Sequence, residues 1–210
     1  MEKLLYINAS PRGEESYSKR TADAFLEAYE EQTPKIRVSR IDLFDYELPR
    51  FDSLAAEGKY ALMQGFEASQ EAKEAWKKVE AEIERFKGAS IYLFAVPMWN
   101  FSIPYVLKQY IDIIVQPGYT FELGDDGYVG LLKGKKSFSA FARGGAYPPE
   151  SPAASFDYQK PYFESILAFM GIEKIESSVI EPCLAQGREA AQESLSKAKR
   201  EATSLAASFI

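Results

Sequence analysis

Residues 91–104 read Ile-Tyr-Leu-Phe-Ala-Val-Pro-Met-Trp-Asn-Phe-Ser-Ile-Pro, and the fold can be inferred outward from this stretch. The unbroken apolar run over 91–96 predicts a strand that is buried on both faces. A loop over 97–102 follows, and apolar residues at helical spacing then predict a helix over 103–115. A buried strand that leads through a loop into a helix is the repeating unit of a parallel sheet with crossover helices.

The same alternation continues on both sides of this stretch. Further strands are predicted over 4–7, 36–41, 135–142 and 175–180. Further helices are predicted over 69–86, 157–170 and 188–207. One more helix is predicted to begin at Ser16 or Ser18 and to end at about residue 31. A hairpin or an irregular excursion is expected within 118–132, and residues 43–65 are predicted to be irregular. Five alternations indicate an α/β fold, a doubly wound five-stranded parallel sheet with helices on both faces. No repeat or linker divides residues 1–210, so one domain is expected.

Composition excludes several classes of protein. The 210 residues contain no histidine and one cysteine, which excludes Ser-His-Asp catalysis, histidine-ligated metals and an intramolecular disulfide. The 25 Lys+Arg and 31 Asp+Glu give a net charge of −6, which argues against binding to nucleic acid. The longest apolar run, 91–99, is too short to span a bilayer, and Asn8 comes too early for a signal-peptide core. A cytoplasmic protein without membrane association or a bound metal is therefore expected.

Three loops are candidates for a binding site, because ligands of doubly wound sheets bind outside the carboxyl ends of the strands. The first, 8–18, has neither of the glycine-rich nucleotide-binding motifs, but it places Ser10, Ser16 and Ser18 at the start of a helix. Hydroxyl groups and the free amides of a helix N-terminus suit a monophosphate. The alternative is a single N-cap serine in an ordinary solvated turn.

The second loop carries Met98, Trp99, Asn100 and Phe101. Two aromatic rings, a methionine and one amide form the kind of wall that a flat heteroaromatic ring requires. The alternative is that these side chains pack between helices in a small cluster beside the main core. The third loop, 143–147, offers the backbone amides of two glycines, whose lack of a Cβ allows a ligand to approach closely. The alternative for this loop is a hinge or a tight turn.

Together, the serine loop, the aromatic segment over 97–104 and the Arg-Gly-Gly sequence at 143–145 resemble the FMN-dependent NADH azoreductase family, also described as NADH:quinone oxidoreductases. The similarity extends along essentially the whole chain. The resemblance implies a flavodoxin-like fold with strand order 2-1-3-4-5, and a homodimer with FMN near the subunit interface. It implies FMN contacts from Ser10, Ser16, Tyr17 and Ser18 at the phosphate, from Met98, Trp99, Asn100 and Phe101 at the isoalloxazine and ribityl, and from Ala142, Arg143, Gly144 and Gly145 along the polar edge of the flavin.

Three positions qualify this resemblance. Many relatives have Ser where Ala142 stands, so one hydroxyl contact is lost or replaced. Tyr147 follows the glycines at a position where relatives differ, and it is therefore a candidate for contact with the substrate. Because of this difference, the substrate preference of the relatives does not transfer to this chain. Phe169 is the second substrate-side candidate, because in some relatives this position reaches into the pocket of the neighbouring subunit.

The implied chemistry needs no histidine and no catalytic side chain, because the cofactor carries it. NADH would reduce FMN, and the reduced flavin would pass two electrons to a quinone or an azo bond, with ping-pong kinetics. The alternatives are a flavodoxin-type electron carrier, an FAD-containing quinone reductase, and a protein of the same fold without FMN. The sequence leaves open the physiological acceptor, the choice between NADH and NADPH, and whether the loop over 146–156 is a lid or a surface excursion.

Overall fold

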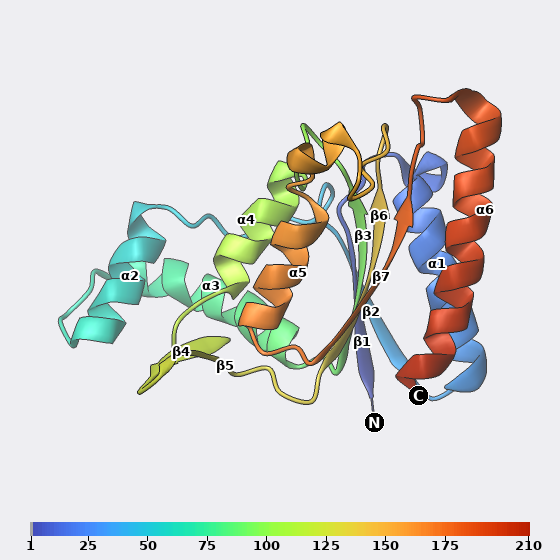
Figure 1. The fold of residues 1–210 in the computed structure, drawn as a ribbon. Helices are drawn as coiled ribbons and strands as arrows, with labels where there is room; N and C mark the ends of the chain where they lie inside the picture. The colour runs from blue at the N-terminus through green and yellow to red at the C-terminus, as the bar shows by residue number, and fades with distance from the viewer. Residues whose placement is uncertain (1) are drawn as a thin grey trace.

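One parallel sheet forms the centre of the chain, in a computed structural model that describes residues 2–210. Its strands lie in the order β2-β1-β3-β6-β7, and every neighbouring pair is parallel (Figure 1). The bounds are Lys3–Asn8 for β1, Arg37–Asp42 for β2, Ile91–Pro97 for β3, Lys136–Ala142 for β6 and Lys174–Ile180 for β7. Because β4 and β5 form a separate sheet, this order is the predicted 2-1-3-4-5 pattern.

Helices cover both faces of the sheet (Figure 1). One face carries α1 (Tyr17–Gln32) and α6 (Gly187–Ala206), and the other carries α3 (Gln70–Lys87), α4 (Tyr105–Ile114) and α5 (Lys160–Phe169). Successive side chains of β3 divide between the two cores. Leu93 packs in the core under α1 and α6, whereas Tyr92 and Phe94 pack in the core under α3, α4 and α5. A strand that serves two cores is apolar throughout, which explains the unbroken run in the sequence.

The segment over 43–65 was predicted to be irregular, and this was wrong, because it contains the helix α2 (Ser53–Gln64). The side chain of Asp52 caps this helix by accepting from amides of its first turn. At Gly58, α2 lies so close to α3 that a Cβ would stand 2.5 Å from the carbonyl oxygen of Ala72. The buried positions of α2 are small residues, so no apolar pattern with a helical period marks it in the sequence.

The predicted hairpin within 118–132 is confirmed. Strands β4 (Phe121–Gly124) and β5 (Gly127–Gly130) pair in antiparallel fashion. The hairpin rests on the end of α5, where the backbones of Gly130 and Gly171 are in direct contact. Only a pair of glycines allows this approach, because a Cβ on Gly130 would lie 2.2 Å from the Gly171 nitrogen.

Two helix starts differ from the sequence predictions. Helix α4 begins at Tyr105 rather than at 103, because Pro104 is its N-cap and has extended backbone, with φ −59° and ψ 146°. Helix α5 begins at Lys160 rather than at 157, because a short 3-10 turn over Pro152–Phe156 precedes it. Within residues 2–210, every helix is too short or too polar to cross a bilayer.

Candidate functional site

Three loops meet at the carboxyl edge of the sheet, where β1, β3 and β6 are neighbours. Backbone hydrogen bonds attach the first two loops to the neighbouring strands, since Ala9 N donates to Ala95 O of β3 at 2.9 Å and Met98 N donates to Ala142 O of β6 at 2.7 Å. These are the loops that the sequence marks as candidates. The structure therefore brings the serine loop, the aromatic segment and the glycine pair together at one edge.

The first loop ends at the N-terminus of α1. The Asn8 side chain holds its start, accepting from the Ser10 amide at 3.1 Å and donating at 2.6 Å to a carboxylate at the end of β2. Ser16 is the N-cap of α1, and its hydroxyl accepts from the amide of Lys19 and lies 3.1 Å from the hydroxyl of Ser18. All three serines are buried. Hydroxyl groups thus gather at a helix N-terminus, where the backbone favours an anion.

Lys19, in the first turn of α1, is already paired. Its ammonium group lies 2.9 Å from Glu14 and 2.8 Å from Asp23. Burial lowers the pKa of Lys19, but the contacts with these two carboxylates outweigh that effect and raise the pKa above its ordinary value. The amides of Tyr17 and Ser18, which have no acceptor within the helix, and the positive end of the helix dipole remain available to an anion.

The second loop is a tight turn with strained backbone. Trp99 and Ser102 exchange backbone hydrogen bonds of 2.9 and 3.0 Å, and between them Asn100 and Phe101 have φ of +47° and +71°. Two successive positive φ values are those of a type I′ turn, in which asparagine is common and phenylalanine is rare. Trp99 and Phe101 are nevertheless 37% and 44% exposed. Strained backbone that presents two open rings is typical of a ligand contact.

Aromatic side chains that sequence reasoning missed extend this turn on one side. The Trp99 ring centroid lies 5.6 Å from that of Phe44 and 6.1 Å from that of Tyr105. Phe44 follows β2 and Tyr105 begins α4. Because Phe44 reaches Trp99 only through the fold, no local motif could have revealed this contact.

The loop over 146–156 packs against the other side of the turn. The Phe101 ring centroid lies 5.2 Å from that of Phe156 and 6.4 Å from that of Tyr147. Just beyond this loop, the Tyr158 amide donates to the carbonyl oxygen of Phe101 at 3.0 Å. The structure thus places the substrate-side candidate Tyr147 next to the aromatic turn.

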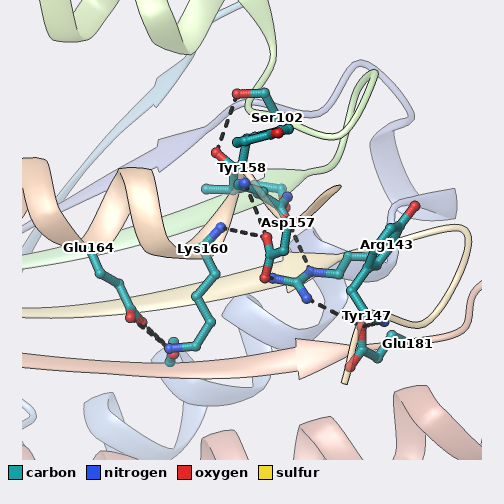
Figure 2. A network of polar contacts seen from close by, with 11 residues as sticks. Ser102, Arg143, Tyr147, Asp157, Tyr158, Lys160, Glu164 and Glu181 are labelled. Atoms are coloured by element: carbon teal, nitrogen blue, oxygen red, sulfur yellow. Dashed lines mark hydrogen bonds and ion pairs between the residues drawn. The ribbon is translucent and has the colours of Figure 1, made fainter. Parts of the chain in front are cut away.

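The third loop begins at Arg143, whose side chain is 3% exposed and points into a polar network (Figure 2). It donates to Gln159 at 2.9 Å, to Asp157 at 2.8 Å and to Glu181 at 3.3 Å. Glu181 also accepts from the Tyr147 amide at 3.0 Å. Each of the three guanidinium nitrogens thus donates to the protein, and an FMN contact from Arg143 stays a prediction.

The two glycines that follow expose their backbone. A Cβ on Gly144 would meet Leu184 at 3.4 Å, and one on Gly145 would meet Tyr147 at 3.5 Å, which are ordinary contact distances. The interior of the protein therefore does not demand glycine at either position. The absence of side chains instead leaves the backbone of this loop accessible to a ligand, as the sequence suggests.

Burial shifts the pKa of two side chains around the site. It raises the pKa of the Cys183 thiol, which disfavours the reactive thiolate. It lowers the pKa of Lys59, whose ammonium lies 5.8 Å from the centroid of the Phe51 ring and 5.5 Å from that of Tyr60.

A groove of about 1360 Å³ runs from the aromatic turn along α4 and α5. Trp99, Tyr105, Tyr158 and Tyr162 contribute aromatic walls, and Phe121 of the hairpin contributes another. A mostly apolar groove with several flat rings suits a planar aromatic molecule.

Phe169 lies apart from the three loops. Its ring packs on the hairpin, with centroids 4.7 Å from Phe121 and 5.5 Å from Tyr128. Within one chain, Phe169 therefore lies behind Phe121, which forms part of the wall of the groove. Its role in the pocket of a neighbouring subunit stays a prediction.

Fold and site together define a class of protein. A model of the family described by its flavodoxin-like fold matches residues 2–205, and the chain belongs to this family. The FMN-dependent NADH:quinone oxidoreductase of Nitratidesulfovibrio vulgaris (strain DP4) is 46% identical over 209 residues, covering 100% of both chains. This finding confirms the resemblance inferred from the sequence.

Two solved structures agree with this assignment. The azoreductase from Bacillus anthracis str. Sterne has a TM-score of 0.90 and 33% identity, over 98% of this chain and 99% of that one. The FMN-dependent NADH-azoreductase from Bacillus anthracis str. Ames Ancestor, in complex with FMN, has a TM-score of 0.87 and 28% identity, over 98% of this chain and 100% of that one.

Proposed function

We propose that this chain reduces quinones and cleaves aromatic azo compounds reductively, with NADH as electron donor and FMN as bound cofactor. One observation carries the proposal: a serine-capped helix N-terminus and a strained aromatic turn meet at one edge of the sheet. The relative at 46% identity is named for the NADH:quinone reaction. Two similar structures are azoreductases, and one of them contains FMN.

The donor groups at this edge fit the phosphate of FMN. Ser10, Ser16 and Ser18 supply buried hydroxyls, and Tyr17 supplies an amide without a helical acceptor. Hydroxyl and amide donors at a helix N-terminus bind a phosphate without a dedicated cation. Lys19 is therefore not required at the phosphate, and its ammonium group is already paired with two carboxylates.

The aromatic turn fits the ring system. Met98, Trp99 and Phe101 offer apolar surface, and Asn100 offers an amide that both donates and accepts hydrogen bonds. The two backbone hydrogen bonds that close the turn hold these groups in place before any ligand arrives. Such pre-organisation reduces the entropy that binding costs.

The glycine loop completes the proposed cofactor site. Ala142, Gly144 and Gly145 would lie along the polar edge of the flavin, and backbone amides there would stabilise the negative charge that reduction brings. A bound FMN would supply the two-electron transfer from NADH to the acceptor. The chain's own part is to orient the ring, to leave one face open and to donate hydrogen bonds. No side chain is assigned a proton-transfer role.

The acceptor site and the subunit arrangement belong to the same proposal. A flat acceptor would enter along the groove towards the aromatic turn, where Tyr147 lies beside Phe101. Exposed apolar side chains stand on α2 and on the hairpin, for example Met63 and Leu123, and a second copy of the chain would cover them. In such a homodimer Phe169 would serve the neighbouring pocket. Light scattering should then give a mass near twice 23.6 kDa.

Residues 1–210 are proposed to act as one domain, because strands from both halves of the chain share one sheet. A cytoplasmic location is proposed because the single cysteine forms no intramolecular disulfide. A flavodoxin-type carrier would bind FMN without catalysing the NADH–quinone reaction, and an FAD enzyme would release FAD on denaturation.

The test identifies the cofactor and the kinetic mechanism on one preparation. Heat-released cofactor should be FMN, and initial rates with NADH at several fixed benzoquinone concentrations should give parallel double-reciprocal lines. Release of FAD, or no turnover by the FMN-loaded protein, would contradict the proposed function. Converging lines would contradict a single ring face that serves both substrates in turn.

A further inference from the structure

One buried guanidinium links the ends of three strands and the start of a helix around the glycine loop. Arg143 follows β6 and donates to Glu181 just beyond β7 and to Asp157 just before α5. Its third partner, Gln159, donates in turn to the carbonyl oxygen of Val96 in β3 at 3.0 Å. Figure 2 shows Arg143 between the two carboxylates, with Tyr147 beside it.

The partners of Arg143 also hold the aromatic turn. Asp157 accepts from the Gln159 amide at 3.1 Å and so fixes the bend that leads into α5. Tyr158, between these two residues, donates its amide to Phe101 and accepts through its carbonyl oxygen from the Ser102 hydroxyl at 3.4 Å. Because Phe101 has a positive φ, it needs such outside support to keep its conformation.

The same partners hold the glycine loop from its far end. Glu181 accepts from the Tyr147 amide, so both ends of the loop over 143–147 are attached to the network. The ring of Tyr147 also lies under the guanidinium, 5.7 Å from centroid to Arg143 Cζ. The two loops that are proposed to touch the flavin ring are therefore positioned by one side chain that need not touch the flavin.

The charges of this cluster do not cancel. One guanidinium meets two carboxylates, and the side chains of Asp157 and Glu181 are 13% and 23% exposed. A buried ion cluster is seldom the most stabilising choice, since apolar side chains of similar volume often serve equally well. An excess negative charge next to the flavin edge would oppose the gain of negative charge by the flavin.

We propose that Arg143 is a positioning residue for the reaction, which holds the glycine loop and the aromatic turn in register through Asp157, Gln159 and Glu181. Through the same network, Glu181 lowers the reduction potential of the bound flavin. This inference rests on the proposed function, and it assigns roles to Asp157, Gln159 and Glu181, which no local motif marks.

The test compares R143Q, R143K and the control K160Q, all loaded with FMN. The control removes an ion pair with Glu164 at the start of the same helix α5, where the two side chains are 34% and 25% exposed. R143Q should weaken FMN binding and lower kcat by about 10- to 100-fold, since small misplacements of reacting groups have large effects. R143K should restore part of both losses, and K160Q should change them by less than about threefold.

A redox titration gives a readout that a purely structural role would not move. E181Q should raise the midpoint potential of bound FMN, because it removes a negative charge while keeping a similar shape. If R143Q does not fold, Q159M tests the same idea, because it removes the hydrogen bonds of Gln159 to Arg143 and to Val96 and leaves both carboxylates paired with the guanidinium. Milder losses of FMN affinity and kcat are expected for Q159M.

The outcomes separate this inference from the proposed function. Wild-type protein that binds no FMN would refute the proposed function itself. Wild-type protein that binds FMN, together with R143Q or Q159M of unchanged affinity and kcat, would overturn the positioning role alone. An unchanged or lower midpoint potential in E181Q would overturn the electrostatic role.

Discussion

The substitution Gly130→Ala should strongly destabilise the protein. A Cβ at this position would lie 2.2 Å from the Gly171 nitrogen and 2.5 Å from its Cα, and these are backbone atoms that cannot rotate away. The strands of the hairpin would have to move until that contact reached about 3.4 Å. This movement would strain the 2.8 Å hydrogen bond from Leu132 to Met170. Overpacking and one weakened hydrogen bond together predict a loss of about 2–4 kcal/mol in the free energy of unfolding.

Equilibrium unfolding in urea measures this loss, and Gly124→Ala in the same hairpin is the matched control. A Cβ on Gly124 would lie 3.1 Å from the side chain of Val129, which can move, and at an ordinary contact distance of 3.5 Å from the carbonyl oxygen of Gly127, so a change of less than about 1 kcal/mol is expected. FMN affinity should survive in both variants, because the hairpin lies outside the three loops. A loss in Gly130→Ala that is no larger than in Gly124→Ala would refute the close backbone contact.

Three further predictions concern the cofactor site and pH. The double variant Ser10→Ala, Ser18→Ala should bind FMN about 10- to 100-fold more weakly in a fluorescence titration. The reason is that hydrogen bonds to a charged group contribute about 1–3 kcal/mol. Trp99→Ala should lower kcat about 100-fold in steady-state assays, since it loosens the ring position. Burial and the hydrogen-bonded Glu80 carboxylate raise the pKa of Tyr119 to about 12. The resulting stabilisation is complete below the ordinary pKa of 10.0 and is lost as pH rises towards 12. Urea midpoints of Tyr119→Phe should therefore fall less steeply than those of wild type over this range.

Much of the fold follows from local sequence. The run over 91–96 predicts a doubly buried strand because a parallel strand under helices on both faces has no polar side. Alternation of strands and helices then places the loops after three strands at one edge, where such sheets bind ligands. The serine loop and the aromatic segment are short continuous motifs, so the sequence also indicates where the cofactor would contact the chain.

What the sequence could not reveal depends on distant contacts or on unusual backbone. Arg143 meets Gln159 and Glu181, which are 16 and 38 residues away, and no local pattern marks such partners. Phe101 adopts a left-handed conformation that phenylalanine avoids, so its residue type argues against the turn that forms. Helix α2 buries only small residues, whereas its large apolar side chains, such as Leu62 and Met63, are exposed and mark no buried face in the sequence.

The most direct test of the central claim is an anaerobic experiment with the two substrates added separately. FMN-loaded protein is mixed with a slight excess of NADH and no acceptor, and the visible absorbance of the flavin is followed. The excess NADH is then removed by rapid gel filtration, and benzoquinone is added. The account predicts that NADH alone bleaches the flavin and that quinone alone restores the absorbance. Flavin that stays oxidised with NADH, or that regains its colour with quinone only while NADH is present, would contradict it.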